Sequence, residues 1–273
     1  MLSSMYSGIT GLNANTQRMA VIGDNIANVN TTGYKGSEIS FEDMVSQSIG
    51  GYTGQEIGGG VMPGKLSYDW NQGTIQKTSN PYDMAITGTG FFQVNDVTDP
   101  INPKTYYSRD GSFSFDAAGN LTTSSGLQVQ GFKVTSAAGV TPVTIDTTTT
   151  NINIDPTKYN TITEDNNGVY YGVDASGVKT ALYQIAVASP KNQSDMAKMS
   201  GNLYTNTTGS MNTPGSPGSG GLGTVVTSSL EASNVDIATE FVNMIEAQRA
   251  FSACSKVITT SDEILQELVS MKR

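Results

Sequence analysis

The sequence contains no histidine, and its 273 residues include one cysteine and one tryptophan. The absence of histidine excludes histidine-ligated metal sites, Ser-His-Asp triads and Cys-His dyads. The single cysteine, Cys254, cannot form a disulfide within the chain, so cysteine usage does not indicate a redox compartment. These absences favour a protein that is not an enzyme, with no catalytic residue, no metal ion and no cofactor.

Charged residues are also scarce, at 14% of the chain, and 15 basic residues against 24 acidic ones give a net charge of −9. Such an acidic chain is a poor candidate for binding nucleic-acid phosphates. No apolar run approaches the roughly 20 residues of a membrane span. The N-terminal segment has no basic residue before Arg18 and therefore does not resemble a Sec-type signal peptide. We expect no nucleic-acid partner, no membrane insertion and, if the protein is exported, a route without a cleaved signal peptide.

The N-terminal segment, from Leu2 to about Asn30, has apolar residues at alternating steps of three and four, which predicts a helix with a heptad-like face. Its apolar stripe consists of Leu2, Met5, Ile9, Leu12, Met19 and Ile26, with Ile22 beside it. Gly8, Gly11 and Gly23 each weaken an isolated helix by up to about 1 kcal/mol. We therefore expect this helix to need a partner.

A second helix is predicted from about residue 233 to the end of the chain, with Ser233 and Asp236 as a capping-box-like start. Its stripe consists of Ile237, Phe241, Met244, Phe251, Ile258, Leu265 and Val269. The pattern allows two interpretations: amphipathic helices that pack on their own domain, or a coiled-coil pair used in assembly. The location of the helices at the two chain ends slightly favours assembly through both stripes.

The middle of the chain reads as short antiparallel strands, with turn signals at Asp110-Gly111, Asn167-Gly168 and 174–177. We predict a mixed α and β fold in which terminal helices form a discontinuous, coiled-coil-like domain beside a central all-β domain. The helical domain is expected at 1–30 with 233–273, a connecting region at 31–70 with 207–232, and the β-domain at 71–206.

The segment ANVNTTGYK ends the first predicted helix, because asparagine and glycine tolerate turn conformations and threonine disfavours helix. It comprises Ala27, Asn28, Val29, Asn30, Thr31, Thr32, Gly33, Tyr34 and Lys35. With the residues before it, DNIANVNTTGYK resembles the signature of the bacterial flagellar rod and hook axial protein family. The segments GTGFFQV, YYSRDGSFSFDAAGNLTTSSGLQVQGF and SSLEASNVDIATEFVNMIEAQRAF resemble the same family in the expected order.

The resemblance implies a structural subunit that self-assembles into a helical tube, with the terminal helices lining its inner core. It also implies the bacterial flagellum as location, outside the cell, and neighbouring rod, hook-cap and hook–filament junction proteins as partners. The ends MLSSMYSGITGL and VITTSDEILQELVSMKR resemble short hook members most, so we expect a hook subunit that transmits torque from rod to filament. The distal-rod members have a similar body and are the alternative. A secreted carbohydrate-active protein is a more distant one, since no aromatic cluster with paired carboxylates is visible.

Overall fold

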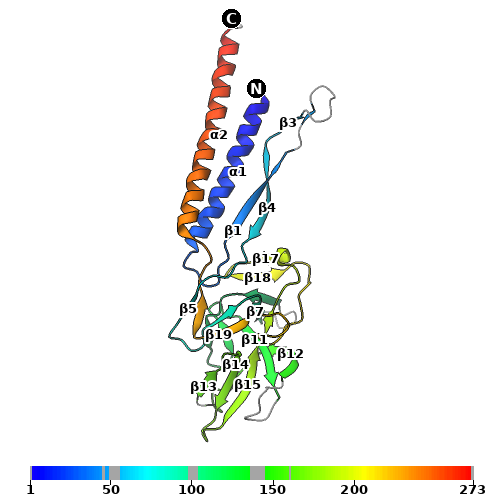
Figure 1. Ribbon diagram of the computed structural model, residues 1–273, viewed down its shortest axis with the longest axis vertical. Helices are drawn as coiled ribbons and strands as arrows, with labels where there is room; N and C mark the ends of the chain where they lie inside the picture. Colours follow the sequence, from blue (N-terminus) through cyan, green and yellow to red (C-terminus); the bar gives the residue numbers. More distant parts are fainter. Residues whose placement is uncertain are drawn as a thin grey trace. The chain divides into compact units, whose positions relative to one another are not determined.

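The computed structural model in Figure 1 describes residues 2–44, 47–48, 56–97, 104–135, 145–159 and 161–271. Two helices, one at each end of the chain, flank a series of short antiparallel strands, so the predicted mixed α and β class is confirmed. The chain forms two compact units. The first comprises Met1–Val29, Lys35–Trp70 and Val235–Arg273, and the second comprises Asn30–Tyr34 and Asn71–Asn234.

The first unit contains an antiparallel helix pair, α1 (Leu2–Ala27) and α2 (Ile237–Met271). Helix α2 starts after Asp236, whose Oδ2 accepts hydrogen bonds from Thr239 N (3.1 Å) and Thr239 Oγ1 (2.6 Å). This carboxylate is the N-cap, so the cap is formed with Thr239 rather than as a box between Ser233 and Asp236. Helix α1 ends where Asn28 Nδ2 bonds back to Asp24 O at 2.9 Å, as the asparagine-rich segment predicts.

A β-hairpin completes the first unit. Strand β1 (Ser37–Asp43) pairs antiparallel with β4 (Val61–Tyr68), with a register shift between Ile39 and Phe41. The short strands β2 (Gln47–Ser48) and β3 (Glu56–Ile57) pair further along the ribbon. Most residues of β1 and β4 are exposed. An isolated two-stranded hairpin is marginally stable in water, so this one depends on α1, where Thr10 Oγ1 accepts a hydrogen bond from Val61 N (3.3 Å).

The second unit is built on one large antiparallel sheet, in the order β13-β14-β15-β11-β7-β8-β18-β17. These strands are β13 (Thr161–Glu164), β14 (Val169–Val173), β15 (Lys179–Ile185), β11 (Gln128–Val134), β7 (Phe91–Asp96), β8 (Lys104–Ser108), β18 (Leu203–Asn206) and β17 (Met196–Lys198). Off this path lie β9 (Phe113–Phe115), β10 (Leu121–Thr123), β12 (Ile145–Asn151) and β16 (Val187–Ala188). A short 3-10 helix, η1 (Gln193–Asp195), precedes β17.

Two further strand pairs belong to the second unit: β6 (Met84–Thr87) with β19 (Thr224–Thr227), and β5 (Ile75–Lys77) with β20 (Ser229–Glu231). One core runs through the unit and is aliphatic and aromatic. Its fully buried members include Phe92, Val94, Phe113, Leu121, Val129, Ile152, Tyr170 and Ile185. The region 31–70 with 207–232, expected to connect the domains, thus contains β1 and β4 in the first unit and β19 and β20 in the second.

The predicted turns are partly right. Gly168 (φ +68°) and Gly177 (φ +79°) close the hairpins β13–β14 and β14–β15, as their Asn-Gly and Ser-Gly signals indicate. The hairpin predicted at Asp110-Gly111 is wrong, because β8 pairs with β7 and β18 while β9 pairs with β10. Gly111 instead lies against the backbone of Met84, whose N donates to Gly111 O at 3.0 Å. A glycine that permits close backbone approach was mistaken for a turn.

Candidate assembly interface

The two terminal helices pack against each other in one continuous antiparallel register. Ser4 Oγ lies 3.5 Å from Ser261 Oγ, Arg18 Nη2 lies 3.7 Å from Glu246 Oε2, and Asn25 Nδ2 donates to Glu240 Oε1 at 3.0 Å. The two residue numbers of each pair add up to about 265, so the helices do not slip along their shared length. The pair therefore exists within one chain.

The glycines of α1 allow this close packing. A Cβ atom at Gly8 would lie 3.0 Å from Ile258 Cγ1, and one at Gly11 would lie 3.0 Å from Cys254 Sγ. Both distances are shorter than ordinary van der Waals contacts, so a larger residue would push α2 away. Gly8 and Gly11 thus weaken the isolated helix and serve the pair, whereas Gly23 has no atom within 4 Å of such a Cβ position.

The predicted apolar stripes divide into three groups. Ile22 is buried, with 4% of its surface exposed. Met5, Leu12, Met19, Ile26, Met244, Phe251, Ile258 and Leu265 are half-buried, and Ile9, Ile237, Phe241 and Val269 are exposed. The side chain of Leu2 lies outside the described part of the structure. Most of the stripe is therefore at least partly covered within one chain, and only a few of its members face outward.

Further apolar side chains, which the periodicity search missed, are exposed on the same helices. They are Tyr6, Val242, Ile245, Val257, Ile264, Leu268 and Met271. Val257, Ile264, Leu268 and Met271 follow steps of seven, four and three, so a second apolar face on α2 was detectable in the sequence. An apolar helix face without a partner in its own chain marks an interaction surface.

Two grooves flank α1 in the first unit. One has a volume of about 550 Å³ and is lined by Ser7, Gly11 and Ala14 of α1, Phe41 and Val61 of the hairpin, and Cys254 of α2, among others. The other, of about 460 Å³, lies along Thr10 and Gln17 on the helix and Met62 and Pro63 on β4. The exposed side chains of Phe41, Met62 and Leu66 extend this apolar surface onto the hairpin.

Asn25 joins three elements of the first unit. Its Nδ2 donates to Ser37 O (2.8 Å) and to Glu240 Oε1, and its Oδ1 accepts from Ser37 N (2.9 Å). The side chain is buried, so each of these bonds satisfies a polar group that would otherwise lack a partner. Asn25 precedes the segment 27–35 and was not singled out from the sequence, although a polar residue within an apolar stripe is a detectable signal.

The signature segment 27–35 passes from one unit to the other and back. Ala27 to Val29 belong to the first unit, residues 30–34 belong to the second, and Lys35 returns to the first and is buried. Gly33 has φ +66°, as a helix-stop glycine predicts, and its N donates to Glu231 O at 2.8 Å. A Cβ atom there would lie 2.6 Å from the carbonyl carbon of Arg109. Only glycine fits this position.

Side chains around Gly33 hold the same segment in the second unit. Thr32 Oγ1 donates to Asp110 Oδ1 (2.9 Å), and Asn202 Nδ2 donates to Thr32 O (2.9 Å). The ring of Tyr34 is buried and has Lys198 Nζ 4.1 Å from its centroid. Burial raises the pKa of Asp110, while the bonds from Ser112 N and Thr32 oppose that rise. Residues 30–34 are thus built into the second unit by polar contacts on several sides.

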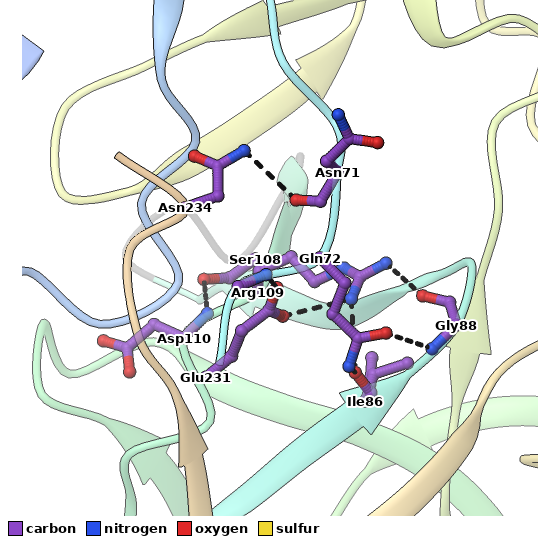
Figure 2. A network of polar contacts seen from close by, with 10 residues as sticks. Asn71, Gln72, Ile86, Gly88, Ser108, Arg109, Asp110, Glu231 and Asn234 are labelled. Atoms are coloured by element: carbon purple, nitrogen blue, oxygen red, sulfur yellow. Dashed lines mark hydrogen bonds and ion pairs between the residues drawn. The ribbon is translucent and has the colours of Figure 1, made fainter. Parts of the chain in front are cut away.

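A buried ion pair lies at the centre of a polar network in the second unit, shown in Figure 2. Arg109 Nη1 lies 3.1 Å from Glu231 Oε2, and Arg109 also donates to the carbonyl oxygens of Ile86 (3.3 Å) and Gly88 (2.6 Å). Glu231 Oε1 accepts from Gly73 N at 2.9 Å. Burial lowers the pKa of Arg109, and the carboxylate of Glu231 opposes this. These contacts hold backbone segments in place: they join β20, the segment at Gly73 and the end of β6.

Among the residues that the structure describes, no three His, Cys, Asp or Glu side chains are grouped so that they could hold a metal ion. In the same residues, neither α1 nor α2 is long and apolar enough to cross a membrane. The features that stand out are therefore packing surfaces and a positional network.

Three family models match the chain. They are "Flagella basal body rod protein" at residues 5–35, "Flagellar hook protein FlgE/F/G D1 domain" at 85–157 and "Flagellar basal body rod FlgEFG protein C-terminal" at 226–271. The chain is also 38% identical to the flagellar basal-body rod protein FlgG of Bacillus subtilis, over 285 residues that cover all of both chains. The chain belongs to the flagellar rod and hook axial protein family. The family indicated by the signature segment is confirmed.

Other relatives fall into the rod and hook branches of this axial family. The rod protein FlgG of Borreliella burgdorferi is 32% identical over 289 residues and covers all of both chains. The hook protein FlgE of Treponema pallidum is 36% identical over 150 residues, which is 51% of this chain and 31% of that protein. This axial protein is therefore a structural subunit of the bacterial flagellum, from a family whose members polymerise with other flagellar components.

Proposed function

We propose that this axial protein is a subunit of the distal rod of the flagellar basal body. The supporting observation is coverage, because the relatives named as rod proteins align with nearly the whole chain, at up to 38% identity over 100% of its length. The relative named as a hook protein aligns with about half of it. The expectation of a hook subunit rested on the two ends alone, so the rod is the better supported alternative.

Assembly in this proposal uses the apolar side chains that the folded chain leaves exposed on its helices. Ile9, Phe241 and Val242 face away from the helix pair, and fully burying an aliphatic or aromatic side chain is worth about 1.5–3 kcal/mol. When identical chains contact one another through two different surfaces, they form a ring only if the rotation from one chain to the next closes after a full turn. Otherwise they form an open helical filament. Copies of one chain would therefore build an open helical rod without a second protein.

The proposed mechanical role requires each unit to keep its shape under load. In the first unit, the α1–α2 pair shares load along a continuous register, and Asn25 ties the hairpin to both helices. In the second, the buried Arg109–Glu231 pair and the polar contacts around Gly33 hold segments far apart in sequence. Breaking one member of such a pair leaves a buried charge, which makes local opening costly.

The proposal also includes neighbours and location. Other rod proteins would adjoin one end of the polymer and hook proteins the other, while hook-cap and hook–filament junction proteins would lie further along the same axis. The rod would lie outside the cytoplasm, as part of the flagellum. Torque from the motor would pass through it by stiffness alone, with no enzymatic step.

Electron microscopy of basal bodies from a deletion strain tests this function. Without the gene, we expect basal bodies that lack the distal rod and the hook, and restoration of both by the unsubstituted chain. A complete rod that lacks only the hook would identify the chain as the hook subunit instead. Cells that still carry filaments would contradict both assignments. Polymer of the purified chain gives an independent measurement, since a rod subunit should form straight tubes and a hook subunit curved ones.

A further inference from the structure

Within the described residues, no helix lies opposite the C-terminal end of α2. In the register of the pair, where facing residue numbers add up to about 265, Leu2 at the start of α1 faces Glu263. Figure 1 shows α2 continuing past the start of α1. The last turns, from Ile264 to Met271, therefore project beyond the described part of α1.

This projecting end is apolar on its outer surface. Ile264, Leu268, Val269 and Met271 are exposed, the last two at 70% and 82% of their surface. Removing apolar side chains of this kind from water lowers the free energy of the system. Leu265 and Leu268 lie seven residues after Ile258 and Ser261, which pack on α1. The face of α2 that packs on α1 therefore continues past the point where α1 begins. The surface of a second α1 would extend the packing along this face of α2.

The same chain offers such a surface in the 550 Å³ groove beside α1. One wall is α1 at Ser7, Gly11 and Ala14, and the other is the hairpin at Phe41 and Val61. Gly11 has no side chain that would fill the groove, and the thiol of Cys254 lines the groove next to Gly11. The groove is therefore apolar, open and formed partly by the helix that the projecting end of α2 lacks.

A single ionic contact would accompany this apolar pairing. The projecting end from Ile264 to Met271 contains one acidic residue, Glu267, and the sequence continues with Lys272 and Arg273. Both Arg18 and Asp43 line the groove, and the present partner of Arg18, Glu246, is exposed and 3.7 Å away. An exposed ion pair of this length is weak and can be exchanged. Glu267 of an incoming helix end would then have Arg18 available beside the apolar contact.

We infer that the end of α2, from Ile264 to Met271, docks into the groove between α1 and the hairpin of a second copy of this chain. The inference rests on the proposed function, because it needs a polymer. The donor and acceptor surfaces differ, so the contact is heterologous and each copy can both give and receive an end. Repetition of this one contact produces an open row of chains.

The native cysteine in the groove makes the contact directly testable. In the variant Leu268→Cys, a docked end places one new thiol near Cys254 of the next chain. The two cysteines of one chain are fourteen residues apart on the same helix, about 21 Å, so they cannot join to each other. Diamide oxidises two thiols to one disulfide and takes up their two hydrogens. We expect oxidised polymer to give a ladder of covalent trimers and larger species on a denaturing gel.

Two variants control for chance crosslinks. Gln266→Cys places the thiol on the opposite side of the same helix end and should give at least tenfold less ladder. Leu268→Cys combined with Cys254→Ser should give nothing larger than dimers. Dimers alone from Leu268→Cys would mean that two ends pair with each other, and intact polymer without crosslinks would mean that the groove holds something else. Either result would overturn the inference and leave the rod assignment standing.

A measurement on the unsubstituted chain covers the case in which Leu268→Cys fails to polymerise. Cys254 should react with a maleimide at least tenfold more slowly in polymer than in monomer, because the docked end covers it. Equal rates would overturn the docking. Failure of the unsubstituted chain to polymerise under any condition would contradict the proposed function itself, and the inference with it.

Discussion

Arg109 and Glu231 form an ion pair 122 residues apart in sequence, with 3.1 Å between Nη1 and Oε2 and at most 5% of either side chain exposed. Further hydrogen bonds join them to backbone atoms of Gly73, Ile86 and Gly88. Neither group is thus a surface charge that solvent could take over. The pair therefore links the first strands of the second unit to its last strand.

Removal of the arginine should therefore be far more damaging than removal of an exposed charge. Arg109→Met leaves Glu231 buried without its partner, and we expect a loss of about 3–5 kcal/mol in the free energy of unfolding. Urea unfolding of the full chain, followed by circular dichroism, measures it. Glu246→Gln breaks the exposed pair with Arg18 and should cost less than about 1 kcal/mol. Equal losses in the two variants would refute the positional role of the buried pair.

Gly33 and Gly177 provide a matched test of the signature segment. Both have positive φ, +66° and +79°, so alanine at either position costs about 1–2 kcal/mol of backbone strain. At Gly177 nothing lies within 4 Å of the new Cβ, whereas at Gly33 it would lie 2.6 Å from Asp110 N. We expect Gly33→Ala to lower the melting temperature clearly more than Gly177→Ala. Similar melting temperatures for the two variants would mean that the close approach at Gly33 relaxes without cost.

The features predicted correctly from the sequence depend on neighbours along the chain. The helix stop after Ala27, positive φ at Gly33 and the hairpins at Gly168 and Gly177 are set by residues within about four positions. The Asp110-Gly111 turn was wrong because the same dipeptide also serves a close contact, here with Met84, 27 residues away. Local chemistry does not distinguish the two uses.

What could not be predicted depends on tertiary partners. Ile22 and Phe241 belong to equivalent apolar stripes, yet one is 4% and the other 51% exposed, since only the helix pairing decides which face is covered. The strand pair β1–β4 lies within residues 31–70, which were expected to be a connection. Arg109 and Glu231 look like ordinary charged residues until the fold brings them together. The expectation of a hook subunit was drawn from the ends, whereas the rod proteins align with nearly the whole chain.

Glu164, at the end of β13, should make the stability of the second unit depend on pH. Both of its carboxylate oxygens are buried without a hydrogen-bond partner in the described structure. Burial, and then the charge of Asp83, raise the pKa of Glu164 from 4.5 to about 8. The folded chain therefore binds this proton more tightly than the unfolded chain, and stability falls as the pH rises from about 4.5 to 8.

The variant Glu164→Gln removes that titration. We expect its melting temperature to exceed that of the unsubstituted chain at pH 8.5 and the difference to shrink toward pH 4.5. Asp83 acts on Glu164 and Tyr170 responds to it, and neither of them supplies a positive charge. Glu263→Gln, at an exposed carboxylate of α2, should not reproduce the difference. A pH-independent difference would show that Glu164 is ionised throughout.

Gly8 and Gly23 separate the two effects of glycine in α1. At Gly23 an added Cβ meets nothing, so Gly23→Ala should stabilise the helix by up to about 1 kcal/mol through helix propensity. At Gly8 the same atom would lie 3.0 Å from Ile258 Cγ1, so Gly8→Ala should lose that gain or reverse it. Thermal unfolding monitored at 222 nm compares the two. If both alanines stabilise equally, α2 is free to move away from α1.

Phe241 and Ile9 test whether the exposed helix faces carry assembly. Their side chains are 51% and 45% exposed, so a lysine at either position stays in water in the monomer and should change the free energy of unfolding by less than about 0.5 kcal/mol. In a polymer the same lysine would be buried without a counter-charge, which is strongly unfavourable. We expect Phe241→Lys and Ile9→Lys to remain folded by circular dichroism and to form no sedimentable polymer. Thr259→Lys, at an exposed polar position of α2, should polymerise normally, while Ile22→Lys should unfold the helix pair itself. Normal polymerisation of Phe241→Lys and Ile9→Lys would move the interface away from these faces of the helices.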